Sequence, residues 1–296
     1  MPELPEVENL RRSLESGLLG ARVGTVLLAR TDIVHGWSDR KRIETGDLLG
    51  GCSIASLDRR GKQLAIIGDR GSGLVVHLGM SGQLRWGSGE DSAGLHVHAR
   101  WGILDSLGAR RTLEFRDPRR FGGLFPFRSR TDLESRLWAD LGPDAVGEPL
   151  DSLSAHLRTA FRSSRRAIKS VLLDQSVIAG IGNIYADEAL FAAGIDPRCR
   201  ADRLAASRSD RLAEEIQRVL RAAIDAGGTT LRDYVDASGR SGSFQSLHAV
   251  YGRAGLGCRL CSAILRSGLV SGRTTVWCPS CQSRSRSRGP DRGSCT

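Results

Sequence analysis

Short hydrophobic runs separated by glycine-rich turns occupy the chain from residue 22 to about residue 128. Runs of this length between turn signals are typical of strands, and their regular succession favours an all-β domain. We therefore predict a β-sandwich with strands at residues 23–29, 53–57, 63–67, 74–78, 96–104 and 111–115.

An amphipathic run from Val7 to Leu18 precedes this region and predicts a helix. We expect this helix to pack beside the sandwich. The residues before it would then emerge at one edge of the β-domain and not as a free tail.

The pattern changes at residues 141–150, which carry the glycine and proline expected of an interdomain linker. Beyond them, apolar residues recur at helical spacing and predict helices at residues 153–161, 166–173, 184–191 and 211–226. The sequence thus predicts an α+β protein with more than one domain.

The charge balance indicates the class of partner. Lys and Arg number 43 against 33 Asp and Glu, which gives a net charge of +10 and favours a polyanion, with nucleic acid the default candidate. No apolar run reaches the roughly 18 residues of a membrane span, and the N-terminus lacks a secretory signal. We expect a cytoplasmic protein without a membrane partner.

Four late cysteines form the strongest local motif. Cys258-x-x-Cys261 and Cys278-x-x-Cys281 are separated by 16 residues, the spacing of a four-thiolate zinc site. A closed four-cysteine site holds structure and does not catalyse. We predict one structural Zn²⁺ and neither a catalytic metal nor an organic cofactor. Between the pairs, Arg273 begins a predicted hairpin strand from which it can enter a DNA minor groove.

The first six residues carry candidate chemistry. Removal of Met1 would expose the secondary amine of Pro2, and an α-amino group has a pKa of about 7.7–8.0, against about 10.4 for lysine. Such an amine is a nucleophile, and with a sugar aldehyde carbon it forms a cationic iminium. Glu3 and Glu6 would serve as proton donor and orienter. On these residues alone, the alternative remains that the prolines and acids only begin a helix.

Two glycine-rich loops supply groups suited to entering a damaged duplex. Residues 77–82 contain an apolar wedge, Met80, and residues 117–122 contain Arg119, Arg120 and an aromatic wedge, Phe121. Taken singly, Met80 and Phe121 are better explained as core or turn packing residues.

Two further features would bind phosphate. Lys62 follows Gly61 at the start of a predicted strand, from which its ammonium could reach a phosphate or the reacting base. A turn that opens into a helix at Asn183, with Lys169 nearby, would make a phosphate seat. A solvated lysine and an ordinary helical hairpin are the alternatives.

Several of these motifs, in this order, resemble those of formamidopyrimidine-DNA glycosylases. The resemblance covers residues 1–282 and rests on the motifs Pro2–Glu8, Gly61-Lys62, 77–82, 117–122, 182–186 and 250–253. It implies a β-sandwich domain and a helix-two-turn-helix (H2TH) domain with a β-hairpin zinc finger, which together clamp a kinked duplex.

The resemblance also implies roles for single residues. Pro2 would attack the sugar C1′, Glu3 would protonate the opening sugar, and Glu6 would help to hold the pocket. Lys62 would contact phosphate and assist. Met80, Arg119 and Phe121 would fill the space left by the extruded base, with Arg119 facing the orphaned cytosine. The residues that would grip phosphates are His77, Lys169, Asn183, Tyr251 and Arg273.

The implied protein is a monomeric glycosylase and abasic-site lyase acting on double-stranded DNA with oxidised bases or abasic sites. The boundaries would be 1–130 for the catalytic sandwich domain, 131–152 for the linker, 153–247 for the H2TH domain, 229–245 for a base-capping loop, 248–282 for the zinc finger and 283–296 for a disordered basic tail. Oxidised purines are the expected substrates. The alternatives are an endonuclease VIII-like enzyme for oxidised pyrimidines, or a catalytically silent zinc-finger DNA-binding protein on the same fold.

Overall fold

The computed structural model describes residues 2–36, 43–87, 94–230 and 234–282. Its chain divides into two compact units. Unit 1 comprises Met1–Asp140 and Ala226–Ser243, and unit 2 comprises Leu141–Asp225 and Phe244–Thr296. Part of the predicted capping loop, residues 231–233, and the predicted basic tail, residues 283–296, lie outside the described residues.

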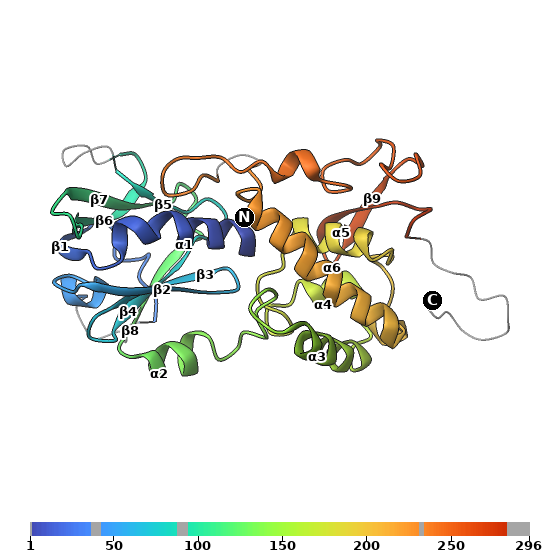
Figure 1. Cartoon of the computed structure of the whole chain (residues 1–296), viewed down its shortest axis with the longest axis horizontal. Helices are drawn as coiled ribbons and strands as arrows, with labels where there is room; N and C mark the ends of the chain where they lie inside the picture. The colour runs from blue at the N-terminus through green and yellow to red at the C-terminus, as the bar shows by residue number, and fades with distance from the viewer. Residues whose placement is uncertain (1, 37–42, 88–93, 231–233, 283–296) are drawn as a thin grey trace. The chain divides into compact units, whose positions relative to one another are not determined.

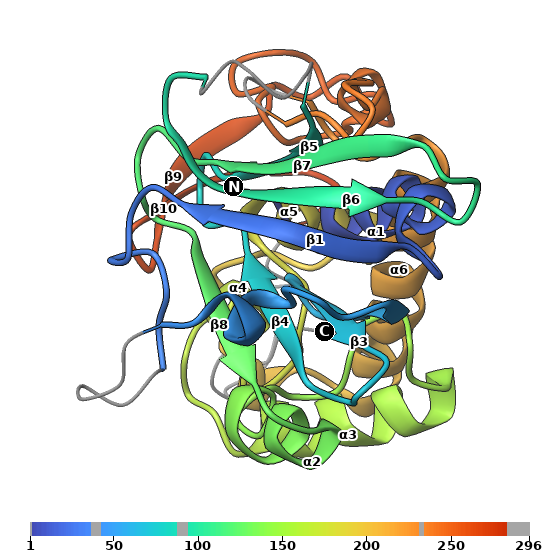
Figure 2. The same cartoon turned by 90° about the vertical axis from the view of Figure 1, so that its left-hand side faces the viewer.

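Unit 1 is built on two four-stranded antiparallel sheets, ordered β1-β6-β7-β5 and β2-β3-β4-β8. The strands are β1 Arg22–Leu28, β2 Ile54–Arg60, β3 Gln63–Gly68, β4 Gly73–His77, β5 Gln83–Trp86, β6 Val97–Leu104, β7 Arg110–Arg116 and β8 Gly123–Phe127. Figure 2 shows the sheets as two layers. The predicted β-sandwich is confirmed, and each predicted strand is present.

Two strands, β5 and β8, were not predicted. Both lie at sheet edges. β8 contains Pro126, which cannot donate a ladder hydrogen bond, and an edge strand tolerates proline because only one side needs partners. β5 is only four residues long. Both strands are short, and β8 also contains a proline, so the periodic signal of each is weak.

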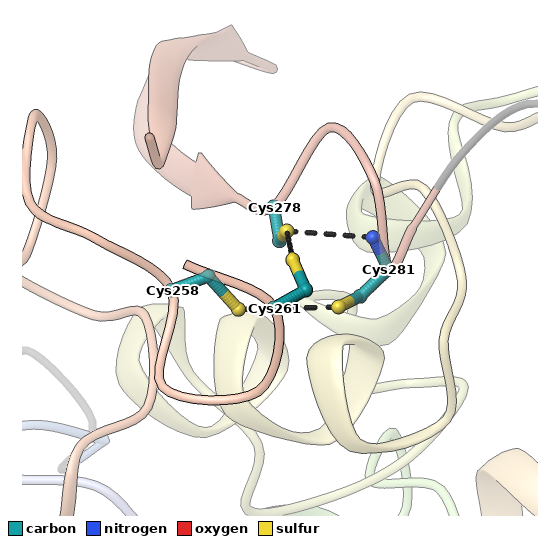
Figure 3. Close-up of side chains that lie close together, drawn as sticks. All are labelled: Cys258, Cys261, Cys278 and Cys281. Carbon is teal, nitrogen blue, oxygen red and sulfur yellow. Dashed lines mark hydrogen bonds between the residues drawn. The ribbon is translucent and has the colours of Figure 1, made fainter. Parts of the chain in front are cut away.

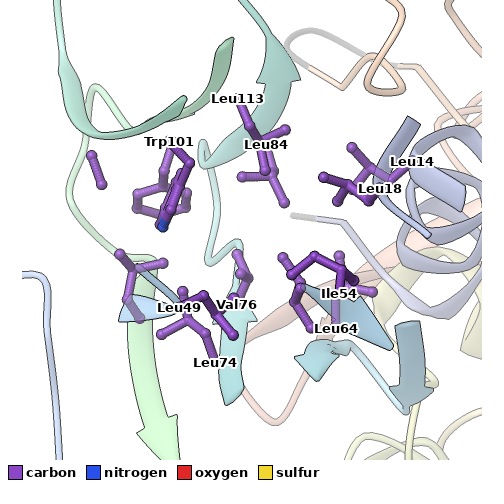
Figure 4. Close-up of a cluster of buried hydrophobic side chains, with 14 of the residues drawn as sticks. Leu14, Leu18, Leu49, Ile54, Leu64, Leu74, Val76, Leu84, Trp101 and Leu113 are labelled. Atoms are coloured by element: carbon purple, nitrogen blue, oxygen red, sulfur yellow. The ribbon is translucent and has the colours of Figure 1, made fainter. Parts of the chain in front are cut away.

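Helix α1, Leu4–Leu18, covers the sandwich beside β2 and β3 (Figure 1). Its apolar residues recur every three or four positions, so they form one buried stripe. Leu14 and Leu18 point into the same interior as Ile54 and Leu64 (Figure 4). Truncating such a buried leucine to alanine typically costs about 2–5 kcal/mol of stability. The predicted packing of the helix on the sandwich is therefore confirmed, and it fixes the place of residues 2 and 3.

Unit 2 is mainly helical. Its helices are α3 Leu150–Arg162, α4 Ile168–Leu172, α5 Asn183–Ala192 and α6 Ala206–Asp225, with short 3-10 turns at η3 Ala201–Arg203 and η4 Phe244–Leu247. Each of the four predicted helices is present. A hairpin of β9, Arg266–Val270, and β10, Arg273–Trp277, follows and carries the cysteine motif at its base.

The remaining short elements belong to unit 1. They are η1 Thr45–Leu48, α2 Arg130–Asp132 and the π-helical turn η2 Leu133–Leu137. Leu133 and Trp138 are buried. Among the residues described, we found no helix long and apolar enough to cross a membrane.

Candidate active site

The first helical turn gathers Pro2, Glu3 and Glu6 in a buried position. Glu3 and Glu6 are 3% and 1% exposed, and Pro2 is buried beside them. The backbone N–H of Glu3 donates to Oε2 of Glu6 at 2.8 Å, as in a capping box, so the side chain in the third helical position fixes the residue before the helix. A buried carboxylate held in this way stands beside the predicted nucleophile.

The second oxygen of Glu6 holds a segment from far along the chain. The backbone N–H of Thr229 donates to Glu6 Oε1 at 2.7 Å, and the Tyr234 hydroxyl donates to the Glu6 carbonyl at 2.9 Å. Gly228 has φ +84°, and a Cβ there would lie 2.9 Å from Glu6 Oε1. Burial and the negative charge of Glu6 raise the pKa of Tyr234 well above its usual range, so this phenol stays a hydrogen-bond donor. Part of the predicted capping loop is thus docked on the predicted catalytic helix.

Lys62 and His77 are neighbours at one end of the second sheet. Lys62 occupies the turn between β2 and β3 after Gly61, whose φ is +56°, and it is 8% exposed. His77 ends β4 and pairs with Gln63, the residue after Lys62. Burial, and then the charge of Lys62, lower the pKa of His77 below its usual value. Its Nδ1 is buried without a hydrogen-bond partner among the described residues. A neutral imidazole with an unused polar atom is suited to a hydrogen bond with a ligand.

The two glycine-rich loops lie against each other. Gly79 has φ +59°, and a Cβ there would lie only 2.3 Å from the Phe121 carbonyl carbon. Asp117, fully buried, accepts a hydrogen bond from the Gly122 N–H at 2.7 Å and another from the Ser81 hydroxyl. The loop carrying Met80 and the loop carrying Phe121 therefore form one rigid pair.

The tips of this loop pair are exposed. Met80 is 41% and Phe121 56% exposed, and the Arg119 guanidinium lies over the Phe121 ring at 5.0 Å from its centroid. Arg120, at φ +56°, forms an exposed ion pair with Asp32 at 3.3 Å. Packing within the described residues does not account for Met80 and Phe121, because both of these large apolar side chains are left partly in solvent. The arrangement suits wedges that enter a duplex.

In unit 2, Asn183 and Lys169 converge on one carbonyl. Asn183 begins α5, and its Nδ2 donates to the Thr274 carbonyl at 3.0 Å. Lys169 donates to the same carbonyl at 3.3 Å, but it is fully buried and lies 2.7 Å from Asp187. Burial raises the pKa of Asp187 to about 6, against the lowering effect of Lys169. Arg273, one residue before Thr274, is exposed. The structure brings these residues together, with Lys169 beneath the surface.

Tyr251 is held by Glu188, the residue after Asp187 in α5. Its backbone N–H, with those of Ala249 and Val250, donates to the Glu188 carboxylate at 2.8–2.9 Å. Its ring meets His248 edge to face at 5.5 Å. The turn before the cysteine motif is thereby fixed to α5.

The four cysteines of the motif form one cluster (Figure 3). Their sulfurs all lie within 4.8 Å of one another, with Cys258 to Cys281 at 3.9 Å and Cys261 to Cys278 at 3.5 Å. Tetrahedral zinc with Zn–S bonds of about 2.3 Å separates its sulfurs by about 3.8 Å, so the donor set and its spacing fit zinc. The backbone N–H groups of Leu260 and Cys281 point at sulfurs, as around a thiolate site.

Comparisons with known proteins agree with this geometry. The family model described as Formamidopyrimidine-DNA glycosylase N-terminal domain matches residues 1–124, and the H2TH domain model of the same family matches residues 141–235. The chain is 41% identical over 282 residues to a formamidopyrimidine-DNA glycosylase of Xanthomonas euvesicatoria, covering 95% of this chain and all of that one. The chain belongs to the formamidopyrimidine-DNA glycosylase family.

Other relatives and solved structures of the family match along the same length. A formamidopyrimidine-DNA glycosylase of Stutzerimonas stutzeri is 43% identical over 282 residues, again 95% of this chain and all of the relative. The MutM (Fpg) crystal structure from Thermus thermophilus is 37% identical with a TM-score of 0.81, covering 96% of this chain and all of that one. A Lactococcus lactis Fpg mutant in complex with DNA containing Fapy-dG is 32% identical with a TM-score of 0.85, over 95% of this chain and all of that one. The predicted H2TH fold of this glycosylase family member is confirmed.

Sequence reasoning missed several residues that position the glycosylase site. The buried anchors are Ser81, Asp117, Asp187 and Glu188. A signal existed for two of them, because adjacent acids inside the otherwise apolar helix α5 need buried partners. Asp117 was visible only as part of a loop, and nothing local indicated its hydrogen-bond partners.

Proposed function

We propose that this family member is a bifunctional enzyme of base excision repair, a DNA glycosylase and abasic-site lyase with Pro2 as its nucleophile. The observation that carries the proposal is the buried group Pro2, Glu3 and Glu6 at the start of α1. A helix start that served only folding would need neither two buried carboxylates nor the long-range contact to Thr229.

The chemistry begins at the sugar. With Met1 removed, the Pro2 nitrogen attacks C1′ of the damaged nucleotide, the bond from C1′ to the base breaks, and the base departs with that electron pair and a proton. Glu3 protonates the ring oxygen as the sugar opens, which leaves an iminium between Pro2 and C1′. The iminium draws electrons from the adjacent carbon, so loss of a C2′ proton expels the 3′ phosphate. A second elimination expels the 5′ phosphate, and water then releases Pro2.

The other predicted residues hold the DNA. We infer that Lys62 and His77 bind phosphates next to the reacting sugar, supported by their adjacency and by the unused Nδ1 of His77. Asn183, Tyr251 and Arg273 of unit 2 are proposed to grip the same strand.

The wedge residues act on the opposite strand. Met80 and Phe121 are proposed to fill the gap left by the extruded base, because both are exposed on one rigid loop pair. Arg119, over the Phe121 ring, would read the orphaned cytosine through its acceptors, and Arg120 would contact the backbone. An adenine opposite the lesion lacks these acceptors and would slow excision.

We propose zinc as the ion of the cysteine cluster. Cys258, Cys261, Cys278 and Cys281 would hold it, and when bound it would stabilise the hairpin that carries Arg273. The proposed functional division keeps 1–130 as catalytic domain, 131–152 as linker, 153–247 as H2TH domain and 248–282 as finger, with residues 229–245 covering the extruded base.

Oxidised purines are the proposed substrates, namely 8-oxoguanine opposite cytosine and formamidopyrimidines. Support comes from residues 229–245, which resemble the loop that covers the extruded base in the purine branch. Leu4 gives further support, because the pyrimidine branch typically has glycine at that position. One solved relative from Lactococcus lactis, 32% identical, is bound to DNA containing an oxidised pyrimidine. Single-turnover excision of 8-oxoguanine and of thymine glycol decides between the branches, since equal or faster removal of thymine glycol would contradict the purine assignment.

Borohydride trapping tests the enzyme directly. Reduction should freeze a covalent adduct between the protein and lesion-containing DNA, Pro2→Gly should lose it, and Glu3→Gln should lose base excision but keep lyase action on a preformed abasic site. A matched control, Glu15→Gln at a partly exposed ion pair further along α1, should trap like wild type. Binding without any adduct would leave only a catalytically silent DNA-binding protein.

A further inference from the structure

One edge of the finger hairpin is closed by side chains of the helices. Among the strands that the structure describes, β10 pairs with β9 alone, so the polar backbone groups on its other edge need partners. Asn183 Nδ2 donates to the Thr274 carbonyl, and the Val276 N–H donates to Asp187 Oδ2 at 3.0 Å. At the hairpin turn, the hydroxyls of Ser170 and Ser271 are hydrogen-bonded. The hairpin is therefore held along its length by α4 and α5.

Lys169 lies at the centre of this edge. Its ammonium lies 2.7 Å from Asp187 Oδ1 and donates to the Thr275 hydroxyl at 2.8 Å and to the Thr274 carbonyl at 3.3 Å. An ammonium has three N–H donors, and here it faces three protein acceptors. Lys169 and Asp187 are 0% and 1% exposed, and Thr275 is fully buried. A charge so enclosed has no surface to offer a DNA phosphate.

We propose that Lys169 and Asp187 form a buried pin that sets the position of the finger hairpin, so that Lys169 serves DNA binding as a positioning residue and not as a phosphate ligand. The inference rests on the proposed function, because it assumes that Arg273 and Asn183 contact DNA. Arg273 directly precedes Thr274, and Asn183 shares the Thr274 carbonyl with Lys169. The pin thus fixes one contact residue relative to the other.

The charges of the pin give it a distinctive mutational signature. Removing one partner leaves the other as an uncompensated buried charge, which is strongly destabilising. Removing both leaves a neutral pair of similar volume, which is far better tolerated. The single variants Lys169→Met and Asp187→Asn should therefore each lose more DNA affinity than the double variant does. If Lys169 were a phosphate ligand, the order would differ, because Asp187→Asn would free the Lys169 ammonium to bind DNA.

The test is the dissociation constant of the full-length, zinc-loaded chain for a duplex with a tetrahydrofuran abasic analogue opposite cytosine. Each single variant should bind at least about tenfold more weakly than wild type, and the double variant should return to within about threefold. Equal loss in Lys169→Met and the double variant, with Asp187→Asn unchanged or tighter, would overturn the pin. So would single variants that bind like wild type.

A second measurement separates positioning from general damage. In single-turnover excision at varied enzyme concentration, the pin variants should raise the half-saturating enzyme concentration and leave the maximal excision rate within about twofold, because Pro2 and Glu3 belong to unit 1. In the same variants, the backbone amides of residues 266–278 should exchange their hydrogens faster than in wild type. The matched control is the surface ion pair of Arg200 and Asp202. The variants Arg200→Met and Asp202→Asn should change neither the excision kinetics nor the hydrogen exchange of the hairpin.

Thr275→Val keeps the proposal testable if Lys169→Met does not fold. It removes one acceptor of Lys169 without leaving a charge unpaired, and it should weaken binding several-fold and speed exchange in the hairpin. Unchanged exchange in Thr275→Val would contradict the pin. Failure of wild type to bind the abasic duplex would instead sink the proposed function, while hydrogen exchange would still report on the pin.

Discussion

The backbone N–H of Thr229 donates to Oε1 of Glu6 at 2.7 Å across 223 residues of sequence. The other oxygen of the same carboxylate accepts from Glu3. One side chain therefore ties the segment proposed to cover the damaged base to the residue proposed to protonate the sugar. Displacement of that segment and displacement of Glu3 are linked through a single carboxylate.

Glu6→Gln should break this link. A carboxamide has one acceptor oxygen, so one of the two backbone donors would face an NH₂ group. We expect a loss of about 1–3 kcal/mol in the free energy of unfolding and slower excision at saturating enzyme. Urea unfolding and single-turnover kinetics provide the measurements. Glu15→Gln, at a partly exposed i,i+4 ion pair with Arg11 on the same helix, should change the free energy of unfolding by no more than about 0.5 kcal/mol. Wild-type stability in Glu6→Gln would argue against the shared carboxylate.

His77 should make folding stability depend on pH in the mildly acidic range. Burial holds its pKa below the ordinary 6.5, so the unfolded chain binds more protons than the folded protein as pH falls through 6.5. This contribution to stability is fully present above about pH 6.5 and decreases below it. His77→Asn should flatten the curve of unfolding free energy against pH between about 5 and 7. An unaltered curve would mean that His77 protonates as easily in the folded state.

Gly79→Ala should separate the two wedge loops. The residue has a left-handed φ of +59°, and its new Cβ would lie 2.3 Å from backbone of Phe121. We expect a cost above the roughly 1–2 kcal/mol of a left-handed alanine alone, with weakened preference for cytosine opposite the lesion. Gly108→Ala is the matched control, because its φ is +82° and nothing lies within 4 Å of its Cβ position. Equal costs in the two variants would show that the loops can part without penalty.

Cys278→Ser should release zinc. It removes one thiolate of four and frees the hairpin that carries Arg273, so DNA affinity should fall. Atomic absorption and binding titrations measure the two effects, and Cys52→Ser, at a buried thiol outside the cluster, should keep its metal. One zinc per chain with full affinity in Cys278→Ser would refute the zinc assignment.

The sequence by itself determined the local elements and the family, and it supplied the candidate chemistry that remains a proposal. Helix α1 and the six predicted strands follow from short-range periodicity, since burial of one face imposes a repeat that the residues themselves display. The cysteine cluster follows from spacing, because two close pairs need only a turn each to bring four thiols together. Pro2 and Glu3 stood out because the position of an amine at a chain end needs no fold to be recognised.

Only the tertiary structure decided which distant groups meet. Nothing near Glu6 in sequence indicates Thr229, and nothing near Lys169 indicates Thr275, because such pairings depend on which faces of separate elements come together. Lys169 shows the physical reason most clearly. A lysine in solvent is free to bind a phosphate. The same ammonium, buried with a carboxylate and a hydroxyl, is held by them, and burial is a property of the packed chain and not of the residue.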